Sequence, residues 1–295
     1  MKVKDYHYET FPSYDQEIEG MIELKGNKDN LRCRMIDIPY QEDCIIRLLY
    51  PHTILDEQRQ YPLVIHVQGS GWYPQDMNDH IFDFMPIVKA GFVYAIVQYH
   101  GAPQSHFPTQ IIDVKKAIRY LNEHYEHYPI DINNVFLSGD SSGGHVALMT
   151  LFTYESHIFD DSHKPLIPLK GVIDLYGIVD FLTFNEWWSK YDWFEKSNLK
   201  DFLGKDFNEE ILKEASPITY LKEHMHLPPI LILHGSKDHV VPFTQSVELY
   251  QRLKQYGYSA TIARVKDADH GRNIFYVKDV YSLIINFLKQ HTKNS

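Results

Sequence analysis

A serine within a glycine-rich turn is the residue whose surroundings point most directly to chemistry. Ser141 is the central residue of a G-x-S-x-G pattern at residues 139–143. The apolar run from Asn134 to Ser138 predicts a buried strand before this turn, and residues 146–149 favour a helix after it. Glycines at such a junction let strand and helix approach closely around the serine. The pattern predicts that Ser141 is a nucleophile, with the helix start directing N–H groups toward the substrate oxygen.

Two downstream turns offer the partners that a serine nucleophile needs. Asp238 follows the buried-strand pattern Ile230 to His234, and His270 follows the pattern Ser259 to Val265. Serine, then acid, then histidine, each after a strand, is the chain order of one large class of serine hydrolases. We therefore predict that His270 is the general base and that Asp238 orients it. The chain has 17 histidines, so His270 is selected by its place in this order and not by its residue type.

A second glycine-rich turn could stabilise the charge that develops on a substrate carbonyl. Residues 66–72, His-Val-Gln-Gly-Ser-Gly-Trp, follow the first buried strand. Backbone N–H groups in such a turn are fixed before the reaction begins. We predict an oxyanion hole made by the N–H groups of Ser70, Gly71 and Ser142. Taken alone, residues 66–72 also fit an ordinary turn between strand and helix.

Short apolar runs alternate with helix-like stretches from Tyr61 onward, which predicts an α/β fold with a mostly parallel central sheet flanked by helices. Helical spacing is clearest in two apolar stripes: Ile111, Val114, Ile118 and Leu121, and Val277, Val280, Ile284 and Phe287. The predicted strands of this sheet are Leu63 to Val67, Phe92 to Gln98, Asn134 to Ser138, Leu169 to Leu175, Ile230 to His234 and Ser259 to Val265.

The segment before Tyr61 predicts an extension of one sheet edge. Leu31 to Pro39 and Cys44 to Tyr50 would pair around residues 41–43. In that register Cys33 lies opposite a residue near Tyr50 and not opposite Cys44, which favours two free thiols.

The chain predicts a single domain over residues 1–295, with an insertion or small cap at about 180–228 where the alternation lapses. Aromatic residues gather in this insertion. They could form the wall of an acyl or aryl pocket, or they could only pack the insertion onto the core. The pocket candidates are Trp72, Trp187, Trp188 and Trp193.

Charge limits the classes of partner. A formal net charge of -10 disfavours nucleic acid and anionic membrane surfaces, so a small-molecule substrate is expected. The charged first residues and the lack of a long apolar run predict a cytoplasmic protein. His224 and His226 lack a third ligand nearby, so we expect no metal, and the predicted chemistry needs no organic cofactor. The sequence leaves the oligomeric state open, and a homo-oligomer is compatible with it.

These motifs resemble the lipase and esterase branch of the α/β-hydrolases, near the hormone-sensitive-lipase-like and feruloyl-esterase-like (BD-FAE) carboxylesterases. The resemblance covers about Tyr61 to Gln290. Three family motifs, His-Gly-Gly-Gly-Trp, Tyr-Arg-Leu-Ala-Pro and Gly-Asp-Ser-Ala-Gly-Gly, correspond to residues 68–72, 99–103 and 139–144. Residues 107–114 and 215–217 and the turns of Asp238 and His270 are also similar. The departures are Gln68 for histidine, Ser70 for the middle glycine and His100 for arginine.

The resemblance implies an α/β-hydrolase fold with the insertion over the active site. It also implies a serine carboxylesterase that cleaves a small acyl or aryl ester through an acyl-enzyme. Two alternatives stay open. A prolyl-oligopeptidase-like serine peptidase shares the nucleophile turn and the triad order, and a non-catalytic binding module could keep the same fold.

Overall fold

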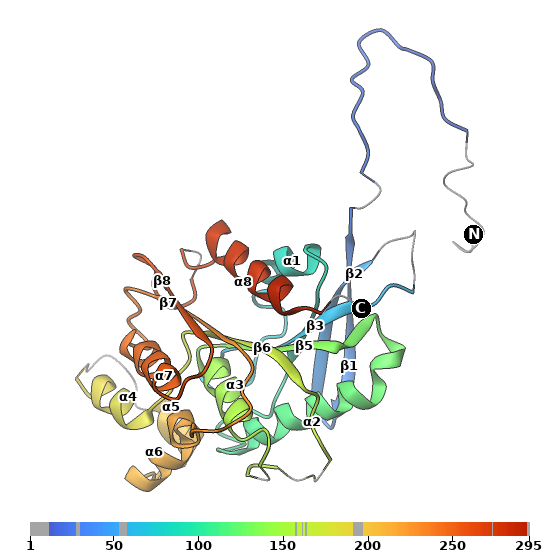
Figure 1. Ribbon diagram of the computed structural model, residues 1–295. Helices are drawn as coiled ribbons and strands as arrows, with labels where there is room; N and C mark the ends of the chain where they lie inside the picture. The colour runs from blue at the N-terminus through green and yellow to red at the C-terminus, as the bar shows by residue number, and fades with distance from the viewer. Residues whose placement is uncertain are drawn as a thin grey trace.

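The computed structural model describes residues 12–27, 30–52, 58–156, 158–160, 162, 164–190, 197–272 and 274–293, and within them eight strands form one sheet (Figure 1). The strands lie in the order β1-β2-β4-β3-β5-β6-β7-β8. Their bounds are β1 (Arg32–Gln41), β2 (Cys44–His52), β3 (Tyr61–Val67), β4 (Val93–Val97), β5 (Ile130–Asp140), β6 (Leu169–Leu175), β7 (Ile230–Gly235) and β8 (Ala260–Val265).

Strands β3 to β8 pair in parallel, while β1 and β2 form an antiparallel hairpin that joins the sheet at β4. The predicted parallel sheet and its extension at one edge are therefore confirmed. In the hairpin Cys33 pairs with Pro51, and both cysteines are free. Parallel strands bring their carboxyl ends to one edge of the sheet, which is where the predicted site residues follow β3, β5, β7 and β8.

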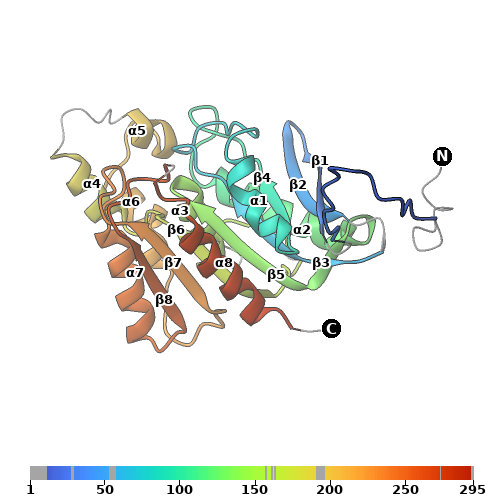
Figure 2. The same ribbon diagram turned by 90° about the horizontal axis from the view of Figure 1, so that it is seen from above.

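Helices cover both faces of the sheet. Figure 1 shows α1 and α8 on one face and α2, α3 and α7 on the other, and Figure 2 shows α1 and α8 lying across the strands. None of the described helices is both long and apolar enough to cross a membrane. The helices are α1 (Ile81–Lys89), α2 (Thr109–His124), α3 (Ser142–Phe152), α4 (Phe181–Trp188), α5 (Ser197–Leu203), α6 (Glu209–Ala215), α7 (Thr244–Gln255) and α8 (Lys278–His291), with short 3-10 turns η3 (Tyr125–His127) and η4 (Pro217–Thr219).

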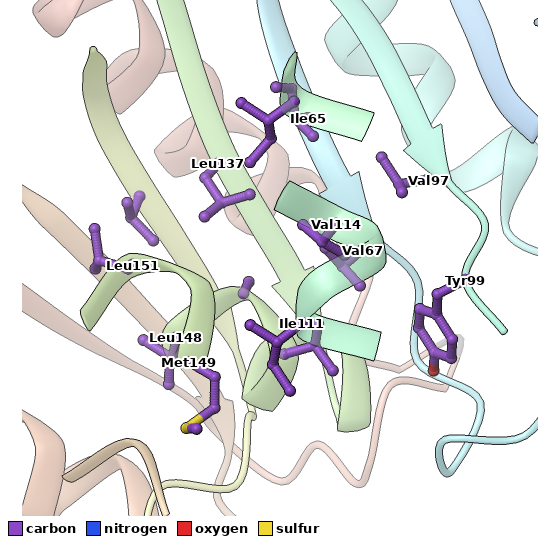
Figure 3. Packing of buried hydrophobic residues seen from close by; sticks show 14 of the residues in the cluster. Ile65, Val67, Val97, Tyr99, Ile111, Val114, Leu137, Leu148, Met149 and Leu151 are labelled. Atoms are coloured by element: carbon purple, nitrogen blue, oxygen red, sulfur yellow. The ribbon is translucent and has the colours of Figure 1, made fainter. Parts of the chain in front are cut away.

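Alternate residues of the central strands supply two separate cores. Val64 and Phe136 belong to the core under α1 and α8, whereas their neighbours Ile65 and Leu137 belong to the core under α2, α3 and α7. This alternation follows from the two-residue period of a strand, which sends successive side chains to opposite faces. Figure 3 shows the second core, where residues of β3 and β5 pack against α2 and α3.

The two predicted helical stripes differ in accuracy. All four residues of the first stripe are buried on α2. The second stripe is partly wrong. Val280 and Ile284 are buried on α8, but Val277 precedes the helix and is 41% exposed. Phe287 is half-buried and packs against the same core, and Leu288, four residues after Ile284, is fully buried there.

Candidate active site

The turn between β5 and α3 holds Ser141 in a conformation that few residues adopt. Its φ of 53° and ψ of -125° lie outside the helical and extended regions. Backbone crowding accompanies this strain: a Cβ atom on Gly143 would lie 2.0 Å from the Val67 carbonyl oxygen, and one on Gly139 would lie 2.3 Å from that of Gly143. Only glycine fits these two positions, so β3, β5 and α3 can approach closely around Ser141.

Two hydrogen bonds link Ser141, His270 and Asp238 in a line. Ser141 Oγ lies 2.7 Å from His270 Nε2, and His270 Nδ1 lies 2.7 Å from Asp238 Oδ2. A carboxylate can only accept, so Nδ1 carries the proton and Nε2 is left to accept from the serine hydroxyl. The structure therefore brings together the three residues that the sequence singles out, from the carboxyl ends of β5, β7 and β8.

Asp238 is buried and held by several donors. Its Oδ1 accepts from the backbone N–H groups of Val240 and Val241 at 2.9 and 2.8 Å. Burial acts against ionisation, but hydrogen bonds from His234 and His270 hold the pKa of Asp238 well below its usual range. The carboxylate is thus charged throughout the pH range in which a histidine can act as a base.

The oxyanion loop differs from expectation at one donor. The N–H of Ser70 donates to Ser142 Oγ at 2.9 Å, so it is engaged inside the protein. The N–H groups of Gly71 and Ser142 have no acceptor among the described residues. Gly71 has a φ of 63°, a left-handed conformation that glycine adopts without strain. Two of the three predicted donors are therefore available to a substrate oxygen.

Buried polar groups hold the oxyanion loop against the nucleophile turn. Asp140 Oδ1 accepts from the Gly69 N–H at 2.9 Å and from His66 Nε2 at 3.1 Å. His66 Nδ1 lies 3.2 Å from Ser138 Oγ, so Asp140 and Ser138 together fix its ring. Gln68, which stands where the resembled family has histidine, donates through Nε2 to the Asp76 carbonyl at 3.1 Å. These contacts explain how the loop keeps its place despite the departures from the family motif.

Two spaces that share lining residues adjoin Ser141. An open cleft of about 330 Å³ is lined by the loop glycines, Ser141 and His270, and also by His80, Tyr176 and Asn198. The second space, called the inner cavity, is smaller, at about 60 Å³, and mostly apolar. The lining of this inner cavity comprises Gly71, Trp72, Ser141, Ser142, Ile178, Phe184, Trp188, Asn198, Val240 and Val241.

The four tryptophans predicted to line the pocket do not all lie there. Trp72 and Trp188 line the inner cavity, and Trp188 Nε1 donates to the Val240 carbonyl at 2.9 Å. Trp187 lines neither space and packs half-buried against the core, because its position next to Trp188 on α4 turns it away. Trp193 lies outside the described residues. The insertion also contributes Phe184 and Asn198, which were not among the predicted pocket residues. The i, i+4 spacing of Phe184 and Trp188 places both on one face of a helix and could have indicated Phe184.

A buried histidine supports the wall of the inner cavity. His145 Nδ1 accepts from Trp72 Nε1 at 3.1 Å, and His145 Nε2 donates to the Ala215 carbonyl at 2.8 Å. Burial lowers the pKa of His145 to about 4, so the ring is neutral and able to accept. Trp72 also stacks on Phe202, with ring centroids 4.5 Å apart. The insertion, which carries Ala215 and Phe202, is thereby tied to the oxyanion loop.

One group of side chains in the described residues has the composition of a metal site. Cys44 Sγ, a ring nitrogen of His100 and a carboxylate oxygen of Asp113 lie within 4.8 Å of one another. The sulfur lies 3.7 and 3.8 Å from the two ring nitrogens, so it faces the ring and not the lone pair of either nitrogen. His100 Nδ1 is bonded to Asp113 at 2.8 Å. The donor set therefore does not fit an ion as it is arranged, and His100 takes the place of the family's arginine beside Asp113.

The chain is similar to several known proteins. The BD-FAE family model matches residues 52–253. Esterase LipQ of Mycobacterium tuberculosis is 27% identical over 243 residues, which cover 79% of this chain and 56% of LipQ. Kynurenine formamidase of Danio rerio is 26% identical over 259 residues, which cover 86% of this chain and 80% of the relative. This chain thus spans little more than half the length of LipQ.

A solved structure described as a truncated carbohydrate esterase from gut microbiota has the same fold. Its TM-score is 0.74 at 24% identity, and the match covers 90% of this chain and 98% of that one. The family model covers more than half of the residues of this chain, including the nucleophile turn and the Asp238 turn. The chain belongs to the BD-FAE family of α/β-hydrolases.

Proposed function

We propose that the protein is a serine carboxylesterase that cleaves esters of short acyl groups. The observation that carries the proposal is the hydrogen-bonded line from Ser141 Oγ through His270 to Asp238, at the base of an open cleft. A serine hydroxyl becomes a useful nucleophile when a neutral imidazole can take its proton and a carboxylate holds that imidazole. The relationship to proteins described as esterases supports the same reaction class.

The reaction begins when Ser141 Oγ attacks the ester carbonyl carbon and its proton passes to His270 Nε2. The carbonyl oxygen gains negative charge, which the N–H groups of Gly71 and Ser142 are placed to receive. Ser142 is also the first residue of α3, so the positive end of that helix faces the same oxygen. His270 then gives its proton to the leaving alcohol, and water, activated by the same histidine, releases the acyl group from Ser141.

The two spaces assign the two parts of the ester. The inner cavity is apolar and small, so it fits the acyl group and limits its length. The outer cleft is open and lined by polar groups, among them His80 and Asn198, so it fits a bulky or hydrated alcohol. We expect acetyl and propionyl esters of polar alcohols to be the best substrates.

Hydrolysis of p-nitrophenyl acetate, butyrate and octanoate by the wild type and by Ser141→Ala tests the proposal. Loss of the nucleophile from a working triad lowers kcat by about 10⁴-fold or more. Ser282→Ala, on the exposed face of α8, is the matched control and should behave as wild type. Equal activity of wild type and Ser141→Ala would contradict the proposal, and so would a preference for octanoate.

Amide hydrolysis is the second candidate, because the chain covers most of a relative described as kynurenine formamidase. A formyl group is the smallest acyl group and would fit the inner cavity. Comparing kcat/KM for an aryl acetate, an N-formyl arylamine and a prolyl p-nitroanilide separates esterase, formamidase and peptidase. A catalytically silent binding module would give no turnover in this series and no labelling by a fluorophosphonate.

We further propose that residues 1–295 form one domain, with residues 180–228 acting as its cap. Support comes from α4 and α5, which contribute Phe184, Trp188 and Asn198 to the inner cavity. If the cap belongs to the same folded unit, limited proteolysis should not cut the chain between residues 180 and 228 and leave a stable fragment without esterase activity.

A further inference from the structure

The N-terminal arm, defined as residues 12–27, exposes an unusual number of apolar side chains. All of its residues are exposed, and the arm leads away from the sheet (Figure 1). Its large apolar residues are 50–86% accessible to solvent. They are Tyr14, Ile18, Met21, Ile22 and Leu24. Half of the large exposed apolar side chains found in the described residues thus lie in this one short segment, and such a concentration indicates an interaction surface.

The arm is also acidic. It carries four carboxylates, from Asp15, Glu17, Glu19 and Glu23, and one amino group, from Lys25. Its partner surface should therefore combine apolar or aromatic groups with positive charge.

A groove of that character lies at the far end of the sheet from Ser141. Its volume is about 480 Å³. Arg34 and Arg59 supply permanent positive charge against a single carboxylate, that of Glu126, and the guanidinium of Arg59 lies 5.2 Å from the centre of the Tyr61 ring. Tyr50 and Tyr128 add aromatic surface. We call this surface the basic groove. It is formed by residues at the start of β3, at the end of β2 and around η3, so it is separate from the catalytic cleft.

The strand that follows the arm lies beside the basic groove. Arg32, the first residue of β1, pairs with His52, which lines the groove. An extended chain of this length reaches about 50 Å, which is enough to cross to a second molecule. The C-terminal end of the arm therefore lies next to the basic groove. A two-fold axis close to this edge of the sheet would let the arm of each copy reach the groove of the other, in one self-complementary contact.

We propose that the protein forms a homodimer in which the arm of each copy lies in the basic groove of the other. The apolar residues of the arm meet Tyr50 and Tyr128, and its carboxylates meet Arg34 and Arg59. The exchange takes place at the end of the sheet opposite Ser141, so it leaves the catalytic cleft open in both copies.

Light scattering and sedimentation velocity of the full chain test the dimer, with an expected mass of twice 34.7 kDa. The arm variant I22D/L24D and the groove variant R34E/R59E should each raise the dimer dissociation constant at least about tenfold. Phe82→Asp is the matched control. Phe82 is 87% exposed on α1, away from the arm and the groove, and its replacement should leave the dimer intact.

Mixing the two variants adds a direct test of exchange. The arm variant retains an intact groove and the groove variant retains an intact arm, so an equimolar mixture can form one of the two contacts. We expect a heterodimer in the mixture at concentrations where each variant alone is monomeric. p-Nitrophenyl acetate hydrolysis per protomer should be the same in every sample, so loss of the dimer is distinguishable from failure of the esterase assignment.

Three results would overturn the proposal. A monomeric wild type whose arm resists proteolysis would place the arm on its own body. A monomeric wild type with a protease-sensitive arm would leave the groove without this occupant. A dimer that survives both double substitutions would rest on another surface.

Discussion

His234 Nε2 lies 3.1 Å from Asp238 Oδ2, the oxygen of the proposed triad that also accepts from His270. His234 is fully buried on β7, where its Nδ1 lies 2.7 Å from Ser246 Oγ and its Nε2 lies 2.9 Å from the Val241 carbonyl. The ring therefore donates through Nε2 and accepts through Nδ1. The single Nε2–H of His234 is thus shared between the Val241 carbonyl and Asp238, whereas the N–H of His270 points to Asp238 alone.

Removing the His234 donor should weaken the protein most above about pH 4, where Asp238 is ionised. The pKa of Asp238 is lower in the folded than in the unfolded chain, so ionised Asp238 stabilises the fold above about pH 4. That contribution is lost as the pH falls through the folded-state pKa. His234→Leu should raise the pKa of Asp238, move acid unfolding to a higher pH and lower the free energy of unfolding at pH 7 by about 1–3 kcal/mol.

His234→Gln should be compared with His234→Leu, because the Gln amide can still donate to Asp238. We expect it to recover most of the stability and kcat lost in His234→Leu. Circular dichroism during acid titration and pH–rate profiles would measure both quantities. Equal losses in the two variants would mean that packing, and not the hydrogen bond, is what His234 contributes.

The buried His145 should also make the stability of the fold depend on pH. Its pKa of about 4 lies below the value of about 6.5 for an exposed histidine, so below pH 6.5 the unfolded chain binds a proton that the folded chain does not. Stability from this group is complete above about pH 6.5 and is lost as the pH falls toward 4, by on the order of 3 kcal/mol.

Urea unfolding at pH 7 and pH 5 would detect this loss, and His145→Gln should make the difference between the two pH values smaller. His224→Gln, at a side chain that is 94% exposed, is the control and should change nothing. A pH dependence that is the same in His145→Gln as in the wild type would assign the effect to other groups.

Ser142 offers a test of the oxyanion loop. Its Oγ accepts the Ser70 N–H, so Ser142→Ala should free that N–H to face the substrate oxygen. We expect kcat for p-nitrophenyl acetate to be at least equal to that of the wild type and up to about tenfold higher, since one oxyanion donor can contribute 10² or more. A fall in kcat would mean that Ser142 Oγ positions the loop and that the bond is needed for catalysis.

The inner cavity should set acyl length. Trp188→Leu enlarges the space beside Ser141, so kcat/KM should fall for acetate and rise for hexanoate, with a change in their ratio of about 10-fold or more. Trp187→Leu changes the neighbouring residue, which lines neither space, and should keep the wild-type ratio. A shift of the same size in both variants would show that α4 as a whole, and not the cavity wall, controls the preference.

Much of the fold was predictable because local sequence carries its determinants. Each parallel strand is a short run of apolar residues, since both of its faces are covered, and the pattern in residues 230–234 alone predicts β7. The prediction for α8 was less accurate at its start, because apolar spacing alone does not show at which residue a helix begins. Val277 precedes α8, and the core-facing side of the helix contains both the fully buried Leu288 and the half-buried Phe287.

The sequence by itself determined the glycine-rich turn at Ser141, the order of Ser141, Asp238 and His270, and the sheet that brings them to one edge. These features depend on glycines, apolar runs and chain order, all of which are local. The tertiary structure alone decided that Ser142 takes the Ser70 N–H, and that Trp72, Ile178 and Trp188 enclose one cavity while Trp187 does not. Such contacts join segments far apart in the chain, so their distances are set by how helices pack on the sheet and not by any local pattern.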